Sequence, residues 1–469
     1  MQQGFLDAAA AICGAAHVVP GTQVEPRYLE AARYGSGQAA ALLRPATSAE
    51  AAALLALCAA SDLILVPQGA HTGLVLAGTP RDAGRQVLLS TERMRECFEL
   101  DLLDRTLRVS AGFKLSEINE RLAPHGLWFP IDLSADPSIG GMLAHNTGGT
   151  RMLRYGDVRA NTLALQVALA EPAGQLLQLG RGLQKDNAGL ALQHLMIGSS
   201  GSLALVCEAT LKLHPLPLQQ AAVLVAPGSL EAVMPLYQRA MAAEFCGLIS
   251  AFEGLSRPAL QAALHVCGDP GRLFDGQLPE YALLIELSSE LPAAVLDLNA
   301  LLQQWLEGEF EAGSVVDAVL GAEETIWALR HSVSEGLREQ GKVIGFDISL
   351  PRRHFMRFRA EAAAWLAQAF PAARVADFGH LGDGGLHFNL VWPKSEGTLP
   401  NDELERLRAG VYAVVASLGG SFSAEHGVGP SLLQHYRERS DPAVLRLAGA
   451  IQTVLNPQSA LGLTNFGPG

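Results

Sequence analysis

Two histidines lie on either side of a glycine-rich segment, and a Glu-His pair follows them further along the chain. Residues 379–389 contain His380 and His387, seven positions apart, and Glu425 directly precedes His426. Imidazole and carboxylate groups are ligands that suit zinc or manganese. These residues could therefore bring a divalent metal and an anionic substrate together.

The glycines between the two histidines indicate how the backbone must position them. Gly382, Gly384 and Gly385 would each weaken a continuous helix. A strand, a tight turn and a second strand would instead let His380 and His387 converge. Spacing alone leaves a second interpretation open, in which these side chains form a hydrogen-bonded structural cluster without a metal.

Composition limits the class of protein. The chain has 469 residues, of which 49% are hydrophobic and 17% charged, so we expect a globular protein of two or three domains. The formal net charge of -13 argues against nucleic-acid binding, which needs a basic face. A small anionic substrate is still compatible, because a local arginine or metal can reverse the sign of the charge inside a pocket.

The cysteines and the apolar segments indicate the compartment. Six cysteines are scattered without a Cys-x-x-Cys pair, which is typical of reduced thiols in a cytosolic protein. The N-terminal residues 1–19 lack the basic start of a signal peptide, and no apolar run reaches the roughly 18 to 20 residues of a membrane span. We expect a soluble, cytoplasmic protein with no transmembrane segment.

A small-residue turn follows an apolar strand near the N-terminus. Ser48 is expected to cap a helix over residues 49–60, and residues 63–67 read as a buried strand that ends at proline. The turn after it could cradle a pyrophosphate, because glycine permits close approach of the backbone. It lacks the Gly-x-Gly-x-x-Gly and P-loop patterns, so an ordinary tight turn is the alternative. The turn consists of Pro67, Gln68, Gly69, Ala70, His71, Thr72 and Gly73.

Further small-residue clusters and a change of pattern complete the chain. Glycine-rich segments recur over residues 138–149 and 197–203, a density that suggests backbone lying against a flat, extended ligand. Residues 163–169 and 175–179 are expected to form a β-hairpin. After a linker at 214–217, apolar strands alternate with helices, and helices on one face of an antiparallel sheet would form a cap. The strands are expected at 221–226, 282–287 and 345–349, and the helices at 229–243, 292–305 and 353–370.

The order of these segments resembles a known superfamily. Residues 42–215 resemble the PCMH-type FAD-binding domain of the vanillyl-alcohol oxidase and p-cresol methylhydroxylase superfamily. Residues 216–469 resemble its FAD-linked oxidase C-terminal domain, and the branch is that of the D-2-hydroxyglutarate and D-lactate dehydrogenases. The resemblance rests on residues 67–73, 89–94, 139–141, 146–149, 154–156, 185–187 and 197–201.

The resemblance implies an α+β fold and a set of cofactor-binding residues. We expect an FAD-binding domain over 1–215, a substrate and cap domain with the metal site and a helix-covered antiparallel sheet over 216–440, and a segment 441–469 that returns to the flavin domain. FAD would contact the turn 67–73. Its other implied contacts are Ser138, Ile139, Gly140, Gly141, Asn146, Thr147, Gly149, Tyr155, Gly156, Lys185, Asn187, Gly198, Ser199 and Gly201.

The resemblance also implies a reaction. His380, His387 and Glu425 would bind zinc, or manganese in its place, and the metal would hold the hydroxyl and a carboxylate oxygen of a 2-hydroxy acid. His426 would take the hydroxyl proton while a hydride passes to flavin N5, which gives a 2-oxo acid. Asn389 would hold substrate or the groups around it.

The substrate-binding residues depart from the hydroxyglutarate branch. That branch grips carboxylates with an Arg, a hydroxyl residue four positions on, and a Lys on the next strand. Here Arg330 and Ser334 match the first two, but Gly345 replaces the Lys, and Lys342 should face the opposite side of the strand. The missing charged hydrogen bond should weaken binding of a distal carboxylate by roughly 1.5 to 3 kcal/mol. D-lactate or a larger D-2-hydroxy acid with a neutral tail therefore competes with D-2-hydroxyglutarate as the expected substrate.

Other roles and partners follow from the same resemblance. Relatives with a Gly-Gly-His turn attach the flavin covalently through the residue that matches His71, whereas a simple hydrogen bond from His71 is the alternative. The electron acceptor would be electron-transfer flavoprotein or a quinone, and a homodimer is allowed. Two other functions are the alternatives: a metal-dependent hydrolase using His380, His387 and Glu425, and a non-catalytic flavin-binding subunit.

Overall fold

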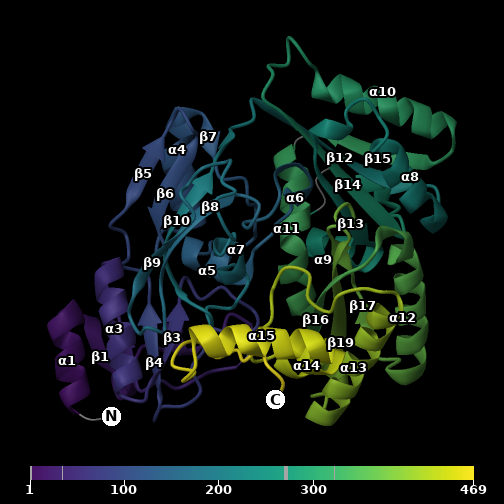
Figure 1. Cartoon of the computed structure of the whole chain (residues 1–469). Helices are drawn as coiled ribbons and strands as arrows, with labels where there is room; N and C mark the ends of the chain where they lie inside the picture. The colour runs from purple at the N-terminus through teal and green to yellow at the C-terminus, as the bar shows by residue number, and fades with distance from the viewer. Residues whose placement is uncertain (1–2, 34, 269–272, 322) are drawn as a thin grey trace. The chain divides into compact units, whose positions relative to one another are not determined.

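The chain forms two compact units, each assembled from separate stretches of sequence (Figure 1). The computed structural model describes residues 3–33, 35–268, 273–321 and 323–469. The first unit comprises Met1–Gly148, Gly156–Leu216 and Glu425–Gly469, and the second comprises Gly149–Tyr155 and Pro217–Ala424. Residues 425–440, which the sequence assigned to the cap, thus belong with the N-terminal residues.

A four-stranded sheet opens the first unit. Its order is β1-β2-β4-β3, in which β4 pairs with β2 and β3 in parallel. Helix α3 begins one residue earlier than expected, because the Thr47 side chain, not that of Ser48, accepts the capping hydrogen bond from the Glu50 backbone N–H. Apolar side chains of α1, α3 and the strands form one core. The elements are α1 (Gln3–Cys13), β1 (Val18–Pro20), α2 (Pro26–Leu29), β2 (Ala41–Leu43), α3 (Ser48–Ala60), β3 (Ile64–Gln68) and β4 (Gln86–Ser90).

The first unit also contains an antiparallel sheet of order β5-β6-β10-β8-β9. Strands β7 and β11 form a separate short antiparallel pair. The expected hairpin is confirmed, since β8 and β9 pair antiparallel. Helices α4 and α5 pack on the apolar side of this sheet. The elements are β5 (Phe98–Asp101), β6 (Thr106–Ser110), α4 (Leu115–Leu122), β7 (Leu127–Trp128), α5 (Ile139–His145), β8 (Thr162–Ala168), β9 (Leu176–Leu179), α7 (Gln193–Met196), β10 (Leu205–Lys212) and β11 (His214–Pro215).

The C-terminal residues run beside the first sheet. Helices α14 (Leu433–Arg439) and α15 (Pro442–Leu455) precede a stretch that pairs with β3. The Leu65 N–H donates to Ala460 O and the Gly462 N–H donates to Leu65 O, each at 2.8 Å. Buried Leu461 joins the core that α1 and α3 form with the strands.

The second unit is built on one large antiparallel sheet. Its order is β15-β12-β14-β13-β18-β19-β16, with β17 added beside β19. The expected strands at 221–226, 282–287 and 345–349 lie within β12, β14 and β16. The strands are β12 (Gln219–Pro227), β13 (Ile249–Ser256), β14 (Tyr281–Ser289), β15 (Val315–Gly321), β16 (Gly341–Ser349), β17 (Arg374–Val375), β18 (Phe378–Gly379) and β19 (Gly385–Pro393).

Helices cover both faces of this sheet, so the expectation of helices on one face is wrong. Every residue of β14 is buried, because its alternating side chains enter two separate cores. One face packs against α8 (Val233–Ala240), α10 (Leu298–Glu311), α12 (Phe355–Ala369) and α13 (Asn401–Ser417). The other packs against α9 (Arg257–Cys267) and α11 (Glu323–Gln340), and α6 (Met152–Tyr155) contacts β13.

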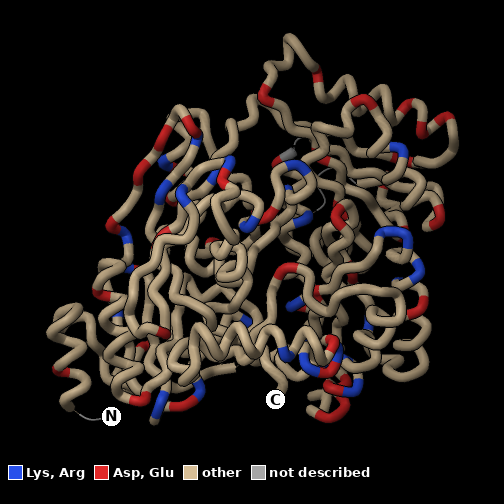
Figure 2. Tube along the Cα trace, in the orientation of Figure 1, with Lys and Arg blue, Asp and Glu red and all other residues tan. Residues whose placement is uncertain are grey.

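Basic and acidic residues are interspersed along the trace of the chain (Figure 2). The helix expected at 292–305 begins later, at Leu298, because Asp297 caps it by accepting a hydrogen bond from the Ala300 backbone N–H at 3.1 Å.

Among the described residues, no helix combines the length and apolar character that crossing a membrane requires.

Candidate functional site

The two histidines of the glycine-rich segment converge as the sequence predicted. Strand β18 ends at Gly379, a tight turn follows, and β19 begins at Gly385. The turn is closed by the Gly384 N–H, which donates to His380 O at 3.0 Å. The His380 and His387 rings meet edge to face with their centroids 5.1 Å apart.

The register of β16 against β19 sets out the residues around His387. Asp347 is directly opposite His387, and Gly345 is opposite Asn389. Because side chains alternate along a strand, Gly345 and Asp347 share one face of β16 while Lys342 belongs to the other. Ile344 and Phe346, on the face of Lys342, enter the core formed with α12 and α13, so the expected orientation of Lys342 is confirmed.

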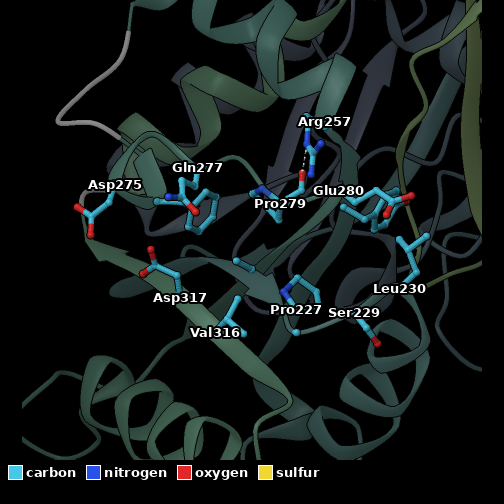
Figure 3. A pocket seen from close by; sticks show the side chains of 14 residues that line it. Pro227, Ser229, Leu230, Arg257, Asp275, Gln277, Pro279, Glu280, Val316 and Asp317 are labelled. Atoms are coloured by element: carbon cyan, nitrogen blue, oxygen red, sulfur yellow. Dashed lines mark hydrogen bonds between the residues drawn. The ribbon is translucent and has the colours of Figure 1, made fainter.

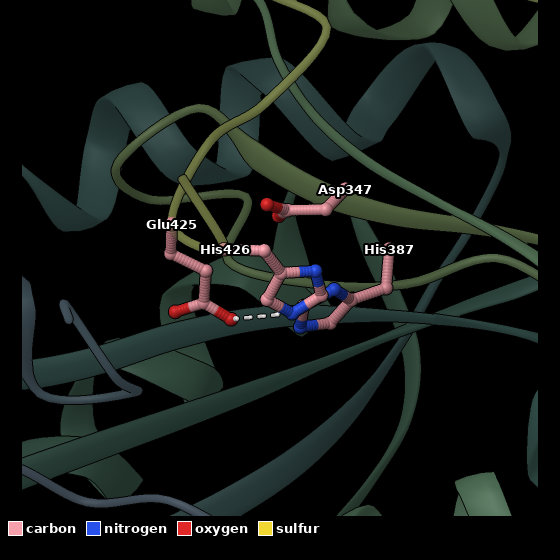
Figure 4. A group of neighbouring side chains, drawn as sticks. All are labelled: Asp347, His387, Glu425 and His426. Carbon is pink, nitrogen blue, oxygen red and sulfur yellow. Dashed lines mark ion pairs between the residues drawn. The ribbon is translucent and has the colours of Figure 1, made fainter. Parts of the chain in front are cut away.

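The Glu-His pair follows directly from a residue tied to β16. The Ala424 backbone N–H donates to the Asp347 backbone oxygen and to its Oδ2, each at 3.2 Å. Glu425 and His426 come next in the chain, so this anchor holds their backbone beside the strand. Asp347, His387, Glu425 and His426 each offer one ligand atom, and these atoms all lie within 4.8 Å of one another (Figure 4).

This four-residue cluster, Asp347, His387, Glu425 and His426, has the donor chemistry of a divalent metal site. Two imidazole nitrogens and two carboxylate oxygens suit zinc or manganese. The side chains of His426 and Glu425 are 23% and 17% exposed, and His426 Nε2 is 3.8 Å from Glu425 Oε1, so a small molecule can reach them. Asp347 was missed by the sequence analysis. Its signal was a lone carboxylate between the apolar residues of β16.

A buried carboxylate links His380 to Arg330. Glu253 on β13 is 1% exposed. Its Oε1 lies 2.7 Å from His380 Nδ1, and its Oε2 accepts from Arg330 Nε at 2.5 Å. Burial alone would raise the pKa of Glu253, but its interactions with Arg330 and His380 lower it to about 2. Glu253 is therefore ionised and acts solely as a hydrogen-bond acceptor.

The two residues expected to bind a substrate carboxylate differ in their surroundings. Arg330 and Ser334 are one turn apart on α11. Arg330 is 7% exposed, pairs with Glu253, and has its guanidinium carbon 4.6 Å from the centre of the Phe378 ring. Ser334 lies on the exposed part of the helix. At least one N–H donor of the Arg330 guanidinium is thus directed to the protein itself.

Three small-residue segments of the first unit lie against one another. A Cβ at Gly69 would overlap Ser138 Oγ, and one at Gly201 would lie 3.6 Å from the Pro67 ring. The Ser200 N–H donates to Ala144 O at 2.8 Å, which ties the segment 197–201 to α5. The turn 67–73, the start of α5 and the segment 197–201 therefore form one surface.

The turn after β3 keeps backbone donors available. Within the described part of the chain, the N–H groups of Ala70, His71, Thr72 and Gly73 have no intramolecular acceptor. Gln68 and His71 hold the turn through their side chains. Gln68 Nε2 donates to Tyr28 O and Gly78 O, while the two His71 ring nitrogens lie 3.2 Å from Arg27 O and 3.1 Å from Thr79 Oγ1.

The other residues expected to contact FAD have mixed surroundings. Asn146 Nδ2 donates to Asp157 at 2.8 Å, a local contact within the first unit. Gly149 and Tyr155 belong to the second unit, where the Tyr155 hydroxyl is 3.0 Å from Ser288 Oγ. Lys185 and Asn187 lie in an exposed loop, residues 181–192.

His145, at the end of α5, lies beside His426. Burial lowers the pKa of His145 to about 4, and repulsion from His426 adds to the effect. A Cβ at Gly427 would lie 3.1 Å from His145 Nδ1. No role for His145 is predicted from the sequence, because a single histidine at the end of a helix indicates no particular function.

A pocket of about 530 Å³ lies elsewhere in the second unit, at the ends of β12 and β15 (Figure 3). Its polar residues include Asp275, Glu280, Asp317 and Arg257, and the Arg257 guanidinium donates to Leu278 O at 3.0 Å. None of the residues expected to do chemistry lines it.

Two protein families match the chain. "FAD binding domain" matches residues 39–180, and "FAD linked oxidases, C-terminal domain" matches residues 216–462. The chain belongs to the FAD-linked oxidase family. It is an FAD-dependent oxidoreductase of the PCMH type, and the resemblance seen in the sequence is confirmed.

Curated relatives of this FAD-linked oxidase cover most of its length. The mitochondrial D-2-hydroxyglutarate dehydrogenase of Bos taurus is 33% identical over 95% of this chain and 81% of its own length. The D-2-hydroxyglutarate dehydrogenase of Xanthomonas citri pv. viticola is 31% identical over 90% of this chain and 88% of its own.

Solved structures support the fold of the oxidase. An alkyldihydroxyacetonephosphate synthase matches with a TM-score of 0.75 at 15% identity, covering 98% of this chain and 84% of its own. A p-cresol methylhydroxylase with substrate bound matches with a TM-score of 0.74 at 12% identity, covering 98% of this chain and 96% of its own.

The first unit of this FAD-linked oxidase has the features that FAD needs. Backbone N–H groups without acceptors at residues 70–73, beside the small-residue surface of α5 and the segment 197–201, suit an anionic pyrophosphate and a flat ring system. Gly69 permits the close approach of the turn 67–73 to Ser138 at the start of α5, which a larger residue would prevent.

Proposed function

We propose that this FAD-linked oxidase is a D-2-hydroxy acid dehydrogenase that forms the 2-oxo acid with the help of a divalent metal. The observation that carries the proposal is the four-residue cluster, whose ligand atoms lie within 4.8 Å of one another. The similarity to D-2-hydroxyglutarate dehydrogenases over 90% or more of the chain supports the same reaction class.

The metal ligands are proposed to be His387 and Glu425, with His380 from the neighbouring turn. Asp347, opposite His387 on the sheet, is a further donor in the same cluster. His387 and Glu425 are common to the sequence expectation and to the cluster. The mixed imidazole and carboxylate set favours zinc, with manganese as the alternative.

His426 is proposed as the base. FAD, when bound, would supply the two-electron acceptor that no side chain provides, and a metal held by these ligands would polarise the substrate hydroxyl. His426 Nε2, which lies 3.8 Å from Glu425 Oε1, takes the hydroxyl proton. Asn389 lies two residues beyond His387 on the same face of β19, where its amide can orient the substrate.

The substrate is proposed to carry a tail without a second carboxylate. Gly345 shares a face of β16 with Asp347, so the position that lacks the Lys is close to the cluster. Arg330 is partly neutralised by Glu253, at 2.5 Å. A D-lactate-like acid, or a larger one with a neutral tail, therefore fits better than a dicarboxylate.

An anaerobic absorbance measurement tests the proposed reaction. Purified protein should show flavin bands that bleach on adding a D-2-hydroxy acid, and pretreatment with a chelator should slow the bleaching. A protein that stays oxidised with every D-2-hydroxy acid tried would contradict the proposal. Comparing kcat/KM for D-2-hydroxyglutarate and D-lactate tests the substrate tail, and a strong preference for the dicarboxylate would refute that part.

The remaining proposals concern the flavin linkage and the acceptor. A non-covalent flavin is favoured because both His71 ring nitrogens already have hydrogen-bonding neighbours. Acid precipitation should leave the yellow colour in the supernatant. Electron-transfer flavoprotein or a quinone is proposed as the acceptor. Neither a hydrolase nor a non-catalytic subunit is supported, since the chain combines the FAD-linked oxidase family with the four-residue cluster.

A further inference from the structure

The strongest unexplained feature near the cluster is the carboxylate of Glu253. Glu253 is 1% exposed and lies on the central strand β13. One of its carboxylate oxygens contacts His380, and the other accepts a hydrogen bond from Arg330. A buried carboxylate is costly unless it is fully paired. Its two partners come from different elements, Arg330 from α11 and His380 from the turn before β19. Glu253 therefore joins two parts of the site that the sequence does not connect.

The pairing determines which nitrogen of His380 carries the hydrogen. The Glu253 carboxylate already accepts from Arg330 Nε, and with the carboxylate as acceptor on both oxygens Nδ1 is the donor across the 2.7 Å contact. The lone pair of the neutral ring is then on Nε2. Metal-binding histidines usually donate their other ring N–H to a carboxylate, which fixes the tautomer and the orientation of the ring.

The same carboxylate fixes the arginine. Arg330 donates Nε to Glu253 Oε2, and its guanidinium lies over the Phe378 ring at 4.6 Å. Both contacts restrain the orientation of the guanidinium plane. Phe378 is also opposite His387 in the β18–β19 pair, so the arginine and the two histidines are held by one set of neighbours.

We propose that Glu253 is a positioning residue that acts through His380 on metal binding and through Arg330 on substrate binding. This inference rests on the proposed function, because it requires His380 to be a metal ligand. Glu253 contacts neither metal nor substrate. Substitution of Glu253 should therefore weaken the binding of metal and of substrate more than it lowers the rate of the chemical step.

Metal affinity in Glu253→Gln tests the first half of the proposal. The amide keeps the shape but removes the charge, and we expect the dissociation constant for zinc, measured by competition with a chromogenic chelator, to rise 10- to 100-fold. Glu309→Gln is the matched control. Glu309 is 5% exposed and pairs with Arg239 at 2.7 Å in the same unit, but it has no histidine partner in the described residues. The control should bind zinc as the wild type does.

A double-mutant cycle separates positioning from general damage. If Glu253 acts through His380, then Glu253→Gln should cause no further loss of zinc affinity in a His380→Ala background. An equal loss in both backgrounds would overturn the inference, as would unchanged zinc affinity in Glu253→Gln. If wild-type protein bound no zinc while a D-2-hydroxy acid still bleached its flavin, both the metal of the proposed function and this role of Glu253 would be refuted, but the dehydrogenase would stand.

Substrate kinetics test the second half. With zinc at saturating concentration, Glu253→Gln should raise KM for the 2-hydroxy acid several-fold and change kcat by less. Glu253→Asp keeps the negative charge, so its zinc affinity should lie between those of the wild type and of Glu253→Gln. A fall in kcat with unchanged KM would contradict a positioning role through Arg330.

Discussion

At the scale of single residues, the proposed chemistry depends most on His426. It is 23% exposed, beside Glu425, and directly follows the stretch tied to Asp347. A positioned base typically contributes 10²- to 10⁴-fold to a rate. His426→Ala should therefore lower the rate of flavin reduction by about 10²- to 10⁴-fold, with FAD content unchanged. Stopped-flow absorbance under anaerobic conditions measures it, and a variant that is reduced at the wild-type rate would assign the proton to another group.

Gly345 makes the choice of substrate testable by a single substitution. It is opposite Asn389 and on the face of Asp347, so Gly345→Lys adds a cation near the cluster. A charged hydrogen bond worth roughly 1.5 to 3 kcal/mol corresponds to about a 10- to 150-fold gain in kcat/KM for D-2-hydroxyglutarate. Gly345→Ala, the control, should give no such gain. An unchanged ratio of kcat/KM for D-2-hydroxyglutarate and D-lactate in the Lys variant would show that this position does not select the tail.

The residues of the cluster could be predicted in part. His387, Glu425 and His426 were found from their types and spacing, because histidines and a Glu-His pair near glycines are unusual in sequence. Asp347 and Glu253 were not found, since each is a lone carboxylate within an apolar strand. Their importance depends on strand pairing and on contacts between distant segments, such as Glu253 with His380, that spacing along the chain does not contain.

At the scale of elements, the short segment 149–155 is held in the second unit by an ion pair between Arg151 and a buried carboxylate. Arg151 Nε donates to Glu286 Oε1 at 3.2 Å, and the Trp327 indole N–H donates to Glu286 Oε2 at 2.6 Å. Glu286 is 0% exposed. Helix α11, strand β14 and this segment therefore share one carboxylate, which also accepts from Ser250 Oγ.

Removing one donor to Glu286 should destabilise the protein measurably. Trp327→Phe keeps most of the ring but leaves the buried carboxylate short of a hydrogen bond, which should lower the free energy of unfolding by about 1 to 3 kcal/mol. Urea denaturation followed by circular dichroism measures the loss. Trp305→Phe is the control, because the Trp305 ring packs against Phe245 and its indole N–H has no hydrogen-bond partner among the described residues. Equal losses in both variants would mean that ring volume, not the hydrogen bond, matters.

Elements with a clear apolar pattern could be predicted from the sequence, but which faces of the sheet the helices cover could not. Strands such as β3, β12 and β14 are short apolar runs that sequence reveals. The apolar residues 281–285 at the start of β14 indicate burial on both faces, which differs from the expectation of helices on one face. Helix α10 begins at Leu298 and not at the predicted Pro292, because Asp297 provides the cap.

At the scale of the whole molecule, the thiols should divide by burial. Cys13, Cys58, Cys97 and Cys207 are buried, whereas Cys246 and Cys267 are exposed. Burial raises the pKa of Cys58 and of Cys207 to about 12, so at pH 8 these thiols stay protonated and unreactive. A thiol reagent at pH 8 should label Cys246 and Cys267 in the native protein, and the other four after unfolding. Peptide mapping by mass spectrometry identifies the sites. Rapid labelling of Cys58 would contradict the burial.

The pairing of Leu65 with Leu461 bears on the order in which the protein can fold during synthesis. Strand β3 lies near the start of the chain, and the residues that complete its edge are made almost 400 positions later. The core that Leu461 joins therefore stays open at this edge while the second unit is translated. We infer that the second unit can finish folding on the ribosome before the first, although the first begins to emerge earlier.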